Sequence, residues 1–283
     1  MKKQLALIFF IAILAIIKTD EPFKLPVLTY HSVMPYNTYE DNPYILSEEV
    51  FYKHMQYLYD NGFNTITIEQ FLNFFLYNIE LPRNPILLTF DDGYLDNVLF
   101  VYPILNQFGF TAISFLLTGA LSIEDPIQFM SIDEIYATND IFEFASHTHD
   151  MHSYPVSVES VENIRFDLRL SFEFPLSSTQ VFAYPFGIYN DNIIEALIAE
   201  DVLVAFTGGR RYVTRNSNPF KLPRFSVVSN WDMELFSAIV NGRHTSILHY
   251  LFHIRTNDKL IKIFTAILII GIHALVFISY KNE

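Results

Sequence analysis

Short apolar runs rich in β-branched and aromatic residues alternate with helix-like stretches from about residue 24 to residue 242. This alternation, sustained over most of the chain, is typical of a parallel sheet whose strands are joined by helical crossovers. No internal repeat, low-complexity linker or glycine/serine hinge interrupts the series. The sequence therefore predicts one α/β domain over 24–242, with a single parallel sheet closed into a distorted (β/α) barrel of the TIM-like type.

The expected strands and helices follow the chain in a regular order. Ser47 is the expected N-cap of the first helix, with Glu48 and Glu49 in its first turn and Asn61-Gly62 at its end. Strands are expected at 26–31, 63–68, 86–90, 111–117, 142–146, 181–184, 202–206 and 222–227, and helices at 48–60, 95–108, 158–173, 191–200 and 232–241. Barrels of this kind carry their functional residues at the carboxyl ends of the strands, so functional residues are expected at those positions.

Charged residues are unevenly distributed along the chain, whose formal net charge is −13. Residues 19–242 hold 10 Lys and Arg against 29 Asp and Glu, whereas the two ends together hold 8 against 2. An acidic body of this kind argues against nucleic acid as a partner. The 51% hydrophobic content is enough to bury a core, and the absence of cysteine excludes disulfides, thiolate metal ligands and cysteine nucleophiles.

Two apolar segments lie outside the predicted domain. Two lysines precede an apolar run at 5–17, which is too short for an ordinary span and is typical of a signal peptide or signal-anchor over 1–20. Because no small-x-small cleavage site follows, we favour an uncleaved anchor over a cleaved signal. Residues 263–279 contain no Asp, Glu, Lys or Arg, which predicts a transmembrane helix, with a buried or interfacial helix as the alternative.

Two adjacent carboxylates follow the strand expected at 86–90, in the segment Thr89-Phe90-Asp91-Asp92-Gly93-Tyr94. Unpaired carboxylates at a strand end are costly to bury, and Gly93 allows a sharp turn beneath them. A lone Asp-Gly pair usually marks a turn with a helix cap. The second carboxylate favours a metal site or an acid/base site instead.

Three of the nine histidines stand in six consecutive residues, His147-Thr148-His149-Asp150-Met151-His152, directly after the strand expected at 142–146. Neutral imidazole nitrogens are good ligands for zinc-type metals, while a solvated histidine-rich loop is the alternative. The two ends of a loop reach one ion more easily than neighbouring residues do. His147 and His152 are therefore the expected metal pair, with His149 turned away or in contact with substrate.

Together these segments resemble the polysaccharide deacetylases with a NodB-type domain, carbohydrate esterase family four. The aspartate pair is similar to the first motif of that family, and the two histidines are similar to the second. Three further segments resemble motifs of the branch that deacetylates poly-β-1,6-N-acetylglucosamine in biofilms: Leu28-Thr29-Tyr30-His31-Ser32, Phe182-Ala183-Tyr184-Pro185-Phe186-Gly187 and Leu222-Pro223-Arg224-Phe225. The early histidine motif implies a circular permutation of the usual family order.

The resemblance implies the catalytic and metal-binding roles. Asp91 would be the general base and His31 the general acid, the alternative for His31 being a core histidine at a strand end. One divalent metal, zinc by default with nickel, cobalt, iron or manganese as alternatives, would be held by Asp92, His147 and His152.

The resemblance also implies how the transition state is supported. The backbone N–H of Phe186 would help to hold the oxyanion, and three neighbours would contact substrate beside it: Tyr184, Pro185 and Gly187. Many family members carry arginine where Ala183 stands, so Arg224 is expected to orient Asp91, with a surface ion pair as its alternative. Trp231 either floors a sugar subsite or belongs to the core.

The expected function is metal-dependent hydrolysis of the N-acetyl groups of an N-acetylglucosamine polymer, with release of acetate. The expected location is the cell membrane, with the catalytic domain extracellular. A peptidoglycan or chitin-type deacetylase is the alternative within the same class. An inactive, membrane-tethered glycan-binding protein is the alternative from another class, but a binding module has no need of the aspartate pair and both histidines.

Overall fold

The computed structural model describes four stretches of the chain, residues 23–35, 42–121, 128–152 and 159–242. All the described residues belong to one compact unit. The segments expected to form a signal or anchor (1–20) and a transmembrane helix (263–279) lie outside the described residues. No helix within the described stretches is long and apolar enough to cross a membrane.

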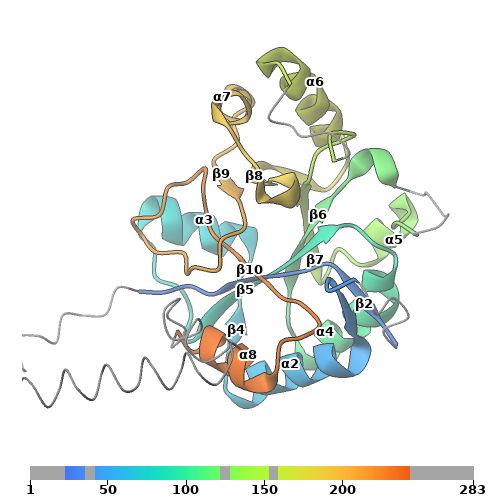
Figure 1. The fold of residues 1–283 in the computed structure, drawn as a ribbon, viewed down its shortest axis with the longest axis vertical. Coiled ribbons are helices and arrows are strands. Elements are labelled where there is room, and N and C mark those ends of the chain that lie inside the picture. Colours follow the sequence, from blue (N-terminus) through green and yellow to red (C-terminus); the bar gives the residue numbers. More distant parts are fainter. Residues whose placement is uncertain (1–22, 36–41, 122–127, 153–158, 243–283) are drawn as a thin grey trace, which may run out of the picture. The chain divides into compact units, whose positions relative to one another are not determined.

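An eight-stranded sheet forms the centre of this unit (Figure 1). Its strands are β1 (Val27–Tyr30), β4 (Asn64–Thr65), β5 (Pro85–Asp92), β6 (Ala112–Leu116), β7 (Phe142–Ser146), β8 (Ser177–Ala183), β9 (Val204–Phe206) and β10 (Phe225–Ser226). They pair in the order β10-β1-β5-β6-β7-β8-β9, with β4 beside β5, and every pairing is parallel. The expected single parallel sheet is therefore confirmed for the main body of the fold.

The sheet curves into an incompletely closed barrel. Its two outer strands, β9 and β10, do not form a regular pair. Instead, Phe206 makes one parallel bridge to Leu222, and the Ala205 N–H donates to the Pro219 carbonyl. The segment that closes the barrel is thus mostly irregular, and the strand expected at 222–227 shrinks to two residues.

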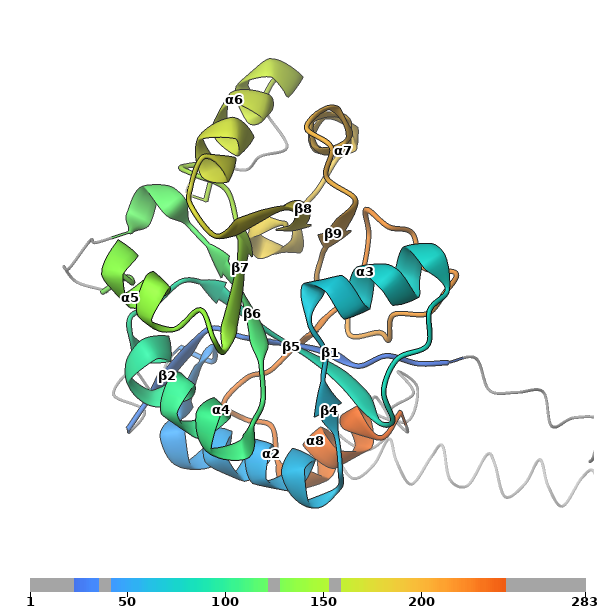
Figure 2. The same ribbon diagram turned by 180° about the vertical axis from the view of Figure 1, so that it is seen from behind.

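The helices lie outside the sheet, as Figures 1 and 2 show from opposite sides. The α-helices are α2 (Glu48–Asp60), α3 (Ile68–Tyr77), α4 (Tyr102–Phe108), α5 (Ile132–Ala137), α6 (Val161–Phe172), α7 (Asp191–Ala199) and α8 (Met233–Val240). Both views place α2, α4 and α8 together against one part of the sheet and α6 beside α7 at another. Ser47 caps α2 as expected, because its side chain accepts the Val50 N–H.

Two expected elements are wrong in detail. The strand expected at 63–68 covers only Asn64–Thr65, because Thr67 and Gln70 form a capping box that starts α3 at Ile68. The helix expected at 95–108 begins instead as a π-helical turn, η1 (Asn97–Val101), which leads into α4. π-Helical turns are frequent at functional sites, and this one follows the aspartate pair.

Aromatic side chains fill much of the core beneath the strand ends. The ring of Tyr30 stacks on Phe90 with centroids 5.3 Å apart and meets Phe51 edge-on at 5.2 Å. Each such pair contributes about 0.5–1.5 kcal/mol beyond its buried area. Trp231 is 8% exposed and belongs to the same core cluster, so of its two expected roles the structure supports the core residue.

Candidate active site

A pocket of about 830 Å³ opens where the strands of the barrel end. Residues from several separated segments line it, and they include all those expected to perform acid/base, metal-binding and orienting roles: His31, Asp91, Asp92, His147, His152 and Arg224. His31 follows β1, the aspartates end β5, the two histidines follow β7, and Arg224 precedes β10. Parallel strands bring these carboxyl ends to one rim of the sheet.

The expected metal ligands lie close together. One ligand atom from each of Asp92, His147 and His152 lies within 4.8 Å of the others. Oδ1 of Asp92 is 3.6 Å from Nε2 of His147 and 3.3 Å from Nε2 of His152. The same oxygen is buried and makes no hydrogen bond of acceptable geometry. A buried acceptor that faces two imidazole nitrogens and has no hydrogen-bond partner fits a divalent cation.

Asp92, His147 and His152 are called the triad below. Contacts with neighbouring residues favour the protonation states in which these three side chains can bind a metal. Nδ1 of His147 lies 2.8 Å from the carbonyl oxygen of Ala183, which can only accept a proton. Nδ1 therefore carries the hydrogen, and the Nε2 lone pair faces Asp92. Burial lowers the pKa of His147, which keeps the ring neutral. Burial raises the pKa of Asp92, but the His152 and His147 imidazoles outweigh it, so the net pKa lies below its usual value.

Strained backbone occurs at three residues of this site. Asp92, Thr148 and Phe186 have φ angles of 76°, 86° and 57°, in the left-handed region that side chains other than glycine rarely adopt. Gly93 continues the turn with φ 81°, and a Cβ atom there would lie 2.8 Å from Cδ2 of Leu116. The turn expected beneath the aspartates is therefore present. Each strained residue stands in a motif that contributes to the pocket.

Arg224 hydrogen-bonds to Asp91, as expected, although the two residues are 133 positions apart in the chain. The two guanidinium nitrogens donate to the two carboxylate oxygens at 2.7 and 2.8 Å, and both side chains are buried. Burial raises the pKa of Asp91, but the charge of Arg224 and its hydrogen bonds outweigh it and lower the net pKa. Asp91 is thus an oriented, ionised carboxylate beside the triad. Arg224 is a buried partner and not a surface ion pair.

Replacing Arg224 by methionine is expected to lower the free energy of unfolding by about 3–5 kcal/mol, because it leaves the buried Asp91 carboxylate without its partner. Urea denaturation measures this change. The matched control is Lys53→Met, which breaks an exposed pair with Glu49 and should leave stability almost unchanged. A loss for Arg224→Met as small as that of the control would contradict a structural role for the buried pair.

His31 lies at the rim of the pocket and is only partly buried. Its Nδ1 atom is buried without a hydrogen-bond partner. The ring packs against Tyr44 with centroids 4.8 Å apart. This position agrees with a role in the pocket better than with the alternative of a core histidine.

The third motif contributes fewer pocket residues than expected. Phe186 and Gly187 line the pocket, and Phe186 is 70% exposed. Tyr184 and Pro185 are buried and are not part of the lining. The Tyr184 hydroxyl donates to the Phe220 carbonyl, so the expectation that its side chain contacts substrate is wrong. Side chains along an extended segment point alternately to its two sides, and the side chain of Tyr184 points into the core and not into the pocket.

His149 stands apart from the triad. Its Nδ1 atom lies 2.9 Å from the hydroxyl of Thr118, and its backbone N–H donates to Asp167. Asp167 also accepts the Asp150 N–H, and its carboxylate thereby anchors the loop between the two metal-ligand candidates. Of the two expectations for His149, the structure supports the residue that is turned away from the metal.

Asp96 and Tyr44 are among the pocket residues that were not anticipated from the sequence. Asp96 accepts hydrogen bonds from the Ser32 hydroxyl and the Val33 N–H, and Tyr44 packs on His31. Asp96 lies four residues after Asp92, so a helical turn after the aspartate pair was a usable signal. Tyr44 has no comparable local signal among 17 tyrosines.

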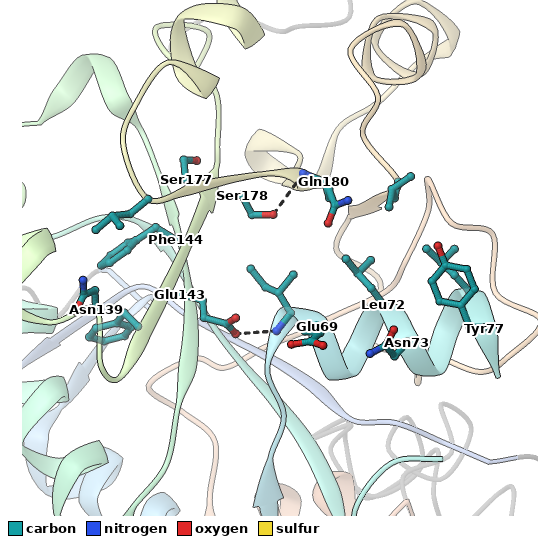
Figure 3. A pocket seen from close by; sticks show the side chains of 15 residues that line it. Glu69, Leu72, Asn73, Tyr77, Asn139, Glu143, Phe144, Ser177, Ser178 and Gln180 are labelled. Carbon is teal, nitrogen blue, oxygen red and sulfur yellow. Dashed lines mark hydrogen bonds between the residues drawn. The ribbon is translucent and has the colours of Figure 1, made fainter. Parts of the chain in front are cut away.

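A second hollow of about 580 Å³ lies at the other end of the sheet, between α3 and the starts of β7 and β8 (Figure 3). Glu143 occupies its centre and accepts the Ile68 N–H at 2.7 Å, which anchors the first turn of α3. Ser178 accepts the Gln180 N–H beside it. Within the described stretches, the one group of three potential metal ligands is the triad in the other pocket.

A parallel-stranded barrel with a buried carboxylate, a carboxylate–imidazole triad and a further imidazole at one rim defines a hydrolase-type α/β protein. Residues 78–202 match the family model described as polysaccharide deacetylase. This segment is a polysaccharide deacetylase domain of the NodB type, the family whose members hydrolyse N-acetyl groups of polysaccharides.

Individual proteins agree with this assignment. The Bacillus subtilis protein YxkH is 26% identical over 228 residues, which cover 80% of this chain and 79% of YxkH. A Staphylococcus aureus poly-β-1,6-N-acetyl-D-glucosamine N-deacetylase is 26% identical over 214 residues, 67% of this chain and 72% of that protein. The solved structure of the Streptococcus pyogenes deacetylase PplD, in complex with acetate, has the same fold, with a TM-score of 0.70, 21% identity and coverage of 77% and 99%.

Proposed function

We propose that this protein removes N-acetyl groups from a β-1,6-linked N-acetylglucosamine polymer at the cell surface, in a metal-dependent reaction that releases acetate. The observation that carries the proposal is the arrangement of Asp91, which is held by Arg224 beside the triad of Asp92, His147 and His152. The named activity of the Staphylococcus aureus relative supports the choice of polymer. The acidic body of the chain suits a polymer that gains cationic amines as it is deacetylated.

The triad residues fit a divalent metal, with zinc as the default for one carboxylate and two imidazoles. When bound, such an ion supplies Lewis-acid polarisation of the amide carbonyl and activation of the attacking water. Asp91 is buried beside these ligands yet ionised, so it can take the proton that the water loses. The bidentate contact with Arg224 fixes the direction in which its carboxylate presents a lone pair.

The remaining steps use His31 and the turn at Phe186. His31 follows β1 while the two histidine ligands follow β7, with β5 and β6 between them in the sheet. It can therefore protonate the departing sugar nitrogen from another side of the pocket. The strained backbone of Phe186 holds its N–H at the rim, where it can donate to the oxyanion. Thr207 steadies this turn by donating to the Gly187 carbonyl at 2.7 Å.

The test is acetate release by the full chain from purified poly-β-1,6-N-acetylglucosamine oligomers, with chitin oligomers and peptidoglycan as competing substrates. We expect the highest kcat/KM on the β-1,6-linked polymer. Preference for chitin or peptidoglycan would replace the proposed substrate with the alternative deacetylase. Binding of oligomers without release of acetate from any polymer would support the inactive glycan-binding protein instead.

The proposed location is the cell membrane, with the catalytic unit outside the cell, where such a polymer is found. The apolar segments near the two ends of the chain support the membrane part of this proposal. Protease accessibility of the catalytic unit on intact cells tests it. Protection of this unit until the cells are lysed would contradict an external location.

A further inference from the structure

A small two-stranded sheet stands beside the catalytic pocket and carries one of its walls. Its strands, β2 (Ser32–Met34) and β3 (Ile45–Ser47), pair in parallel. The Ser32 N–H also donates to the Tyr44 carbonyl at 3.4 Å. His31 immediately precedes β2 and Tyr44 immediately precedes β3, so pairing of the strands sets these two rings side by side.

Asp96 fixes this small sheet to the main fold. One carboxylate oxygen accepts the Ser32 hydroxyl at 2.5 Å, and the other accepts the Val33 N–H at 3.3 Å. Asp96 itself stands at the start of η1, directly after the turn that carries the aspartate pair. The wall that bears Tyr44 is therefore held in a defined position relative to Asp91 and Asp92, as a substrate-binding surface requires.

Tyr44 presents a large ring to the pocket. Its side chain is 43% exposed although one side packs against His31, and it lines the same cavity as the metal-ligand candidates. The cavity also receives the polar side chains of Asn42, Asp96 and Gln128. An exposed aromatic face with a few polar groups around it is the usual composition of a small-ligand subsite. The apolar C–H faces of a pyranose ring pack on such an aromatic face, while its hydroxyls take hydrogen bonds.

A second exposed ring, that of Phe186, lines the same pocket and packs against a member of the triad. Phe186 packs against His152 with centroids 4.7 Å apart, whereas Tyr44 packs against His31. The two rings thus flank the reacting centre from different segments of the fold. A polymer laid through the pocket meets both rings, whereas a single sugar bound at the metal needs contact with only one of them.

We propose that Tyr44 forms a sugar-binding subsite next to the reacting unit, where it stacks on the neighbouring N-acetylglucosamine or glucosamine residue of the polymer. This inference rests on the proposed deacetylase function and deepens it. Tyr44 acts on binding of the polymer and takes no part in proton transfer. Its contribution grows with the number of sugar units that the substrate spans.

The experiment compares the full chain with Tyr44→Ala, Tyr44→Phe and the matched control Tyr136→Ala, whose tyrosine is 48% exposed on α5, outside the pocket lining. Acetate release is measured on β-1,6-linked oligomers of one to five units. We expect Tyr44→Ala to raise KM about tenfold on the longer oligomers, as loss of one aromatic contact implies, with little change on the monosaccharide. Tyr44→Phe should stay within about threefold of the wild type, because the ring face is kept.

The outcomes separate this inference from the function on which it rests. An active wild type with no difference between Tyr44→Ala and Tyr136→Ala at any length would overturn the subsite alone. An equal fall in kcat on every length, including the monosaccharide, would also overturn it, because Tyr44 would then act through the position of His31. Absence of acetate release by the wild type on all substrates would overturn both proposals.

Discussion

Replacing Asp91 by asparagine is expected to lower kcat for acetate release by about 10²–10⁴-fold, the range that general acid–base catalysis contributes. Asparagine keeps the shape of the side chain and part of its contact with Arg224, but it cannot accept the proton of the attacking water. Binding of one metal ion per chain should persist, because Asp91 is not a member of the triad. Steady-state kinetics and metal analysis of the purified protein together measure both effects.

The matched control is Asp92→Asn, which changes the next residue in the chain by the same single substitution. This variant should lose metal as well as activity, because it removes the carboxylate that faces His147 and His152. If both variants lose activity but only Asp92→Asn loses metal, Asp91 acts as the general base and Asp92 as a metal ligand. Acetate release by Asp91→Asn equal to that of the wild type would sink the assigned mechanism.

Removal of the metal is the second change with a large expected effect. A chelator should reduce acetate release by at least about 10²-fold, since polarisation of the carbonyl and activation of water are each worth several kcal/mol. Added zinc or another divalent ion should restore activity after the chelator is removed. His152→Ala should give the same loss, and added metal should restore it only at far higher concentrations, because one of three ligands is missing.

The same loop offers the control for this experiment. His149 lies three residues from His152 but outside the triad, with Nδ1 next to the Thr118 hydroxyl. His149→Ala should therefore keep one metal ion per chain and most of the activity. If chelator-treated protein without bound metal kept full activity, metal dependence would be ruled out and the triad would need another role.

Several elements of the fold could be predicted because their signals are local. Ser47 followed by two acidic residues predicts the start of α2, and the structure has this cap. The strand expected at 142–146 matches β7 in both bounds. Where local signals compete, the prediction fails. The apolar run at 63–68 suggests a strand, but the capping box of Thr67 and Gln70 ends the strand at Thr65.

The sequence alone determined which residue types stand at the ends of which strands. An aspartate pair after one strand and histidines after another already favour a metal site or an acid/base site, because burying such groups is costly unless they bind something. Their resemblance to family motifs extended this to a deacetylase. These inferences succeed because a strand and the residues that follow it are read from a few consecutive positions.

Only the tertiary structure decided which atoms face one another. It buried Tyr184 beneath the pocket, placed Tyr44 on the ring of His31 and set both guanidinium nitrogens of Arg224 against the Asp91 carboxylate. Such contacts depend on strand register and on how the irregular segment that closes the barrel brings distant parts of the chain together. No local sequence pattern specifies either of these. For this protein, the local sequence thus set the chemistry that is available, while barrel closure set its geometry.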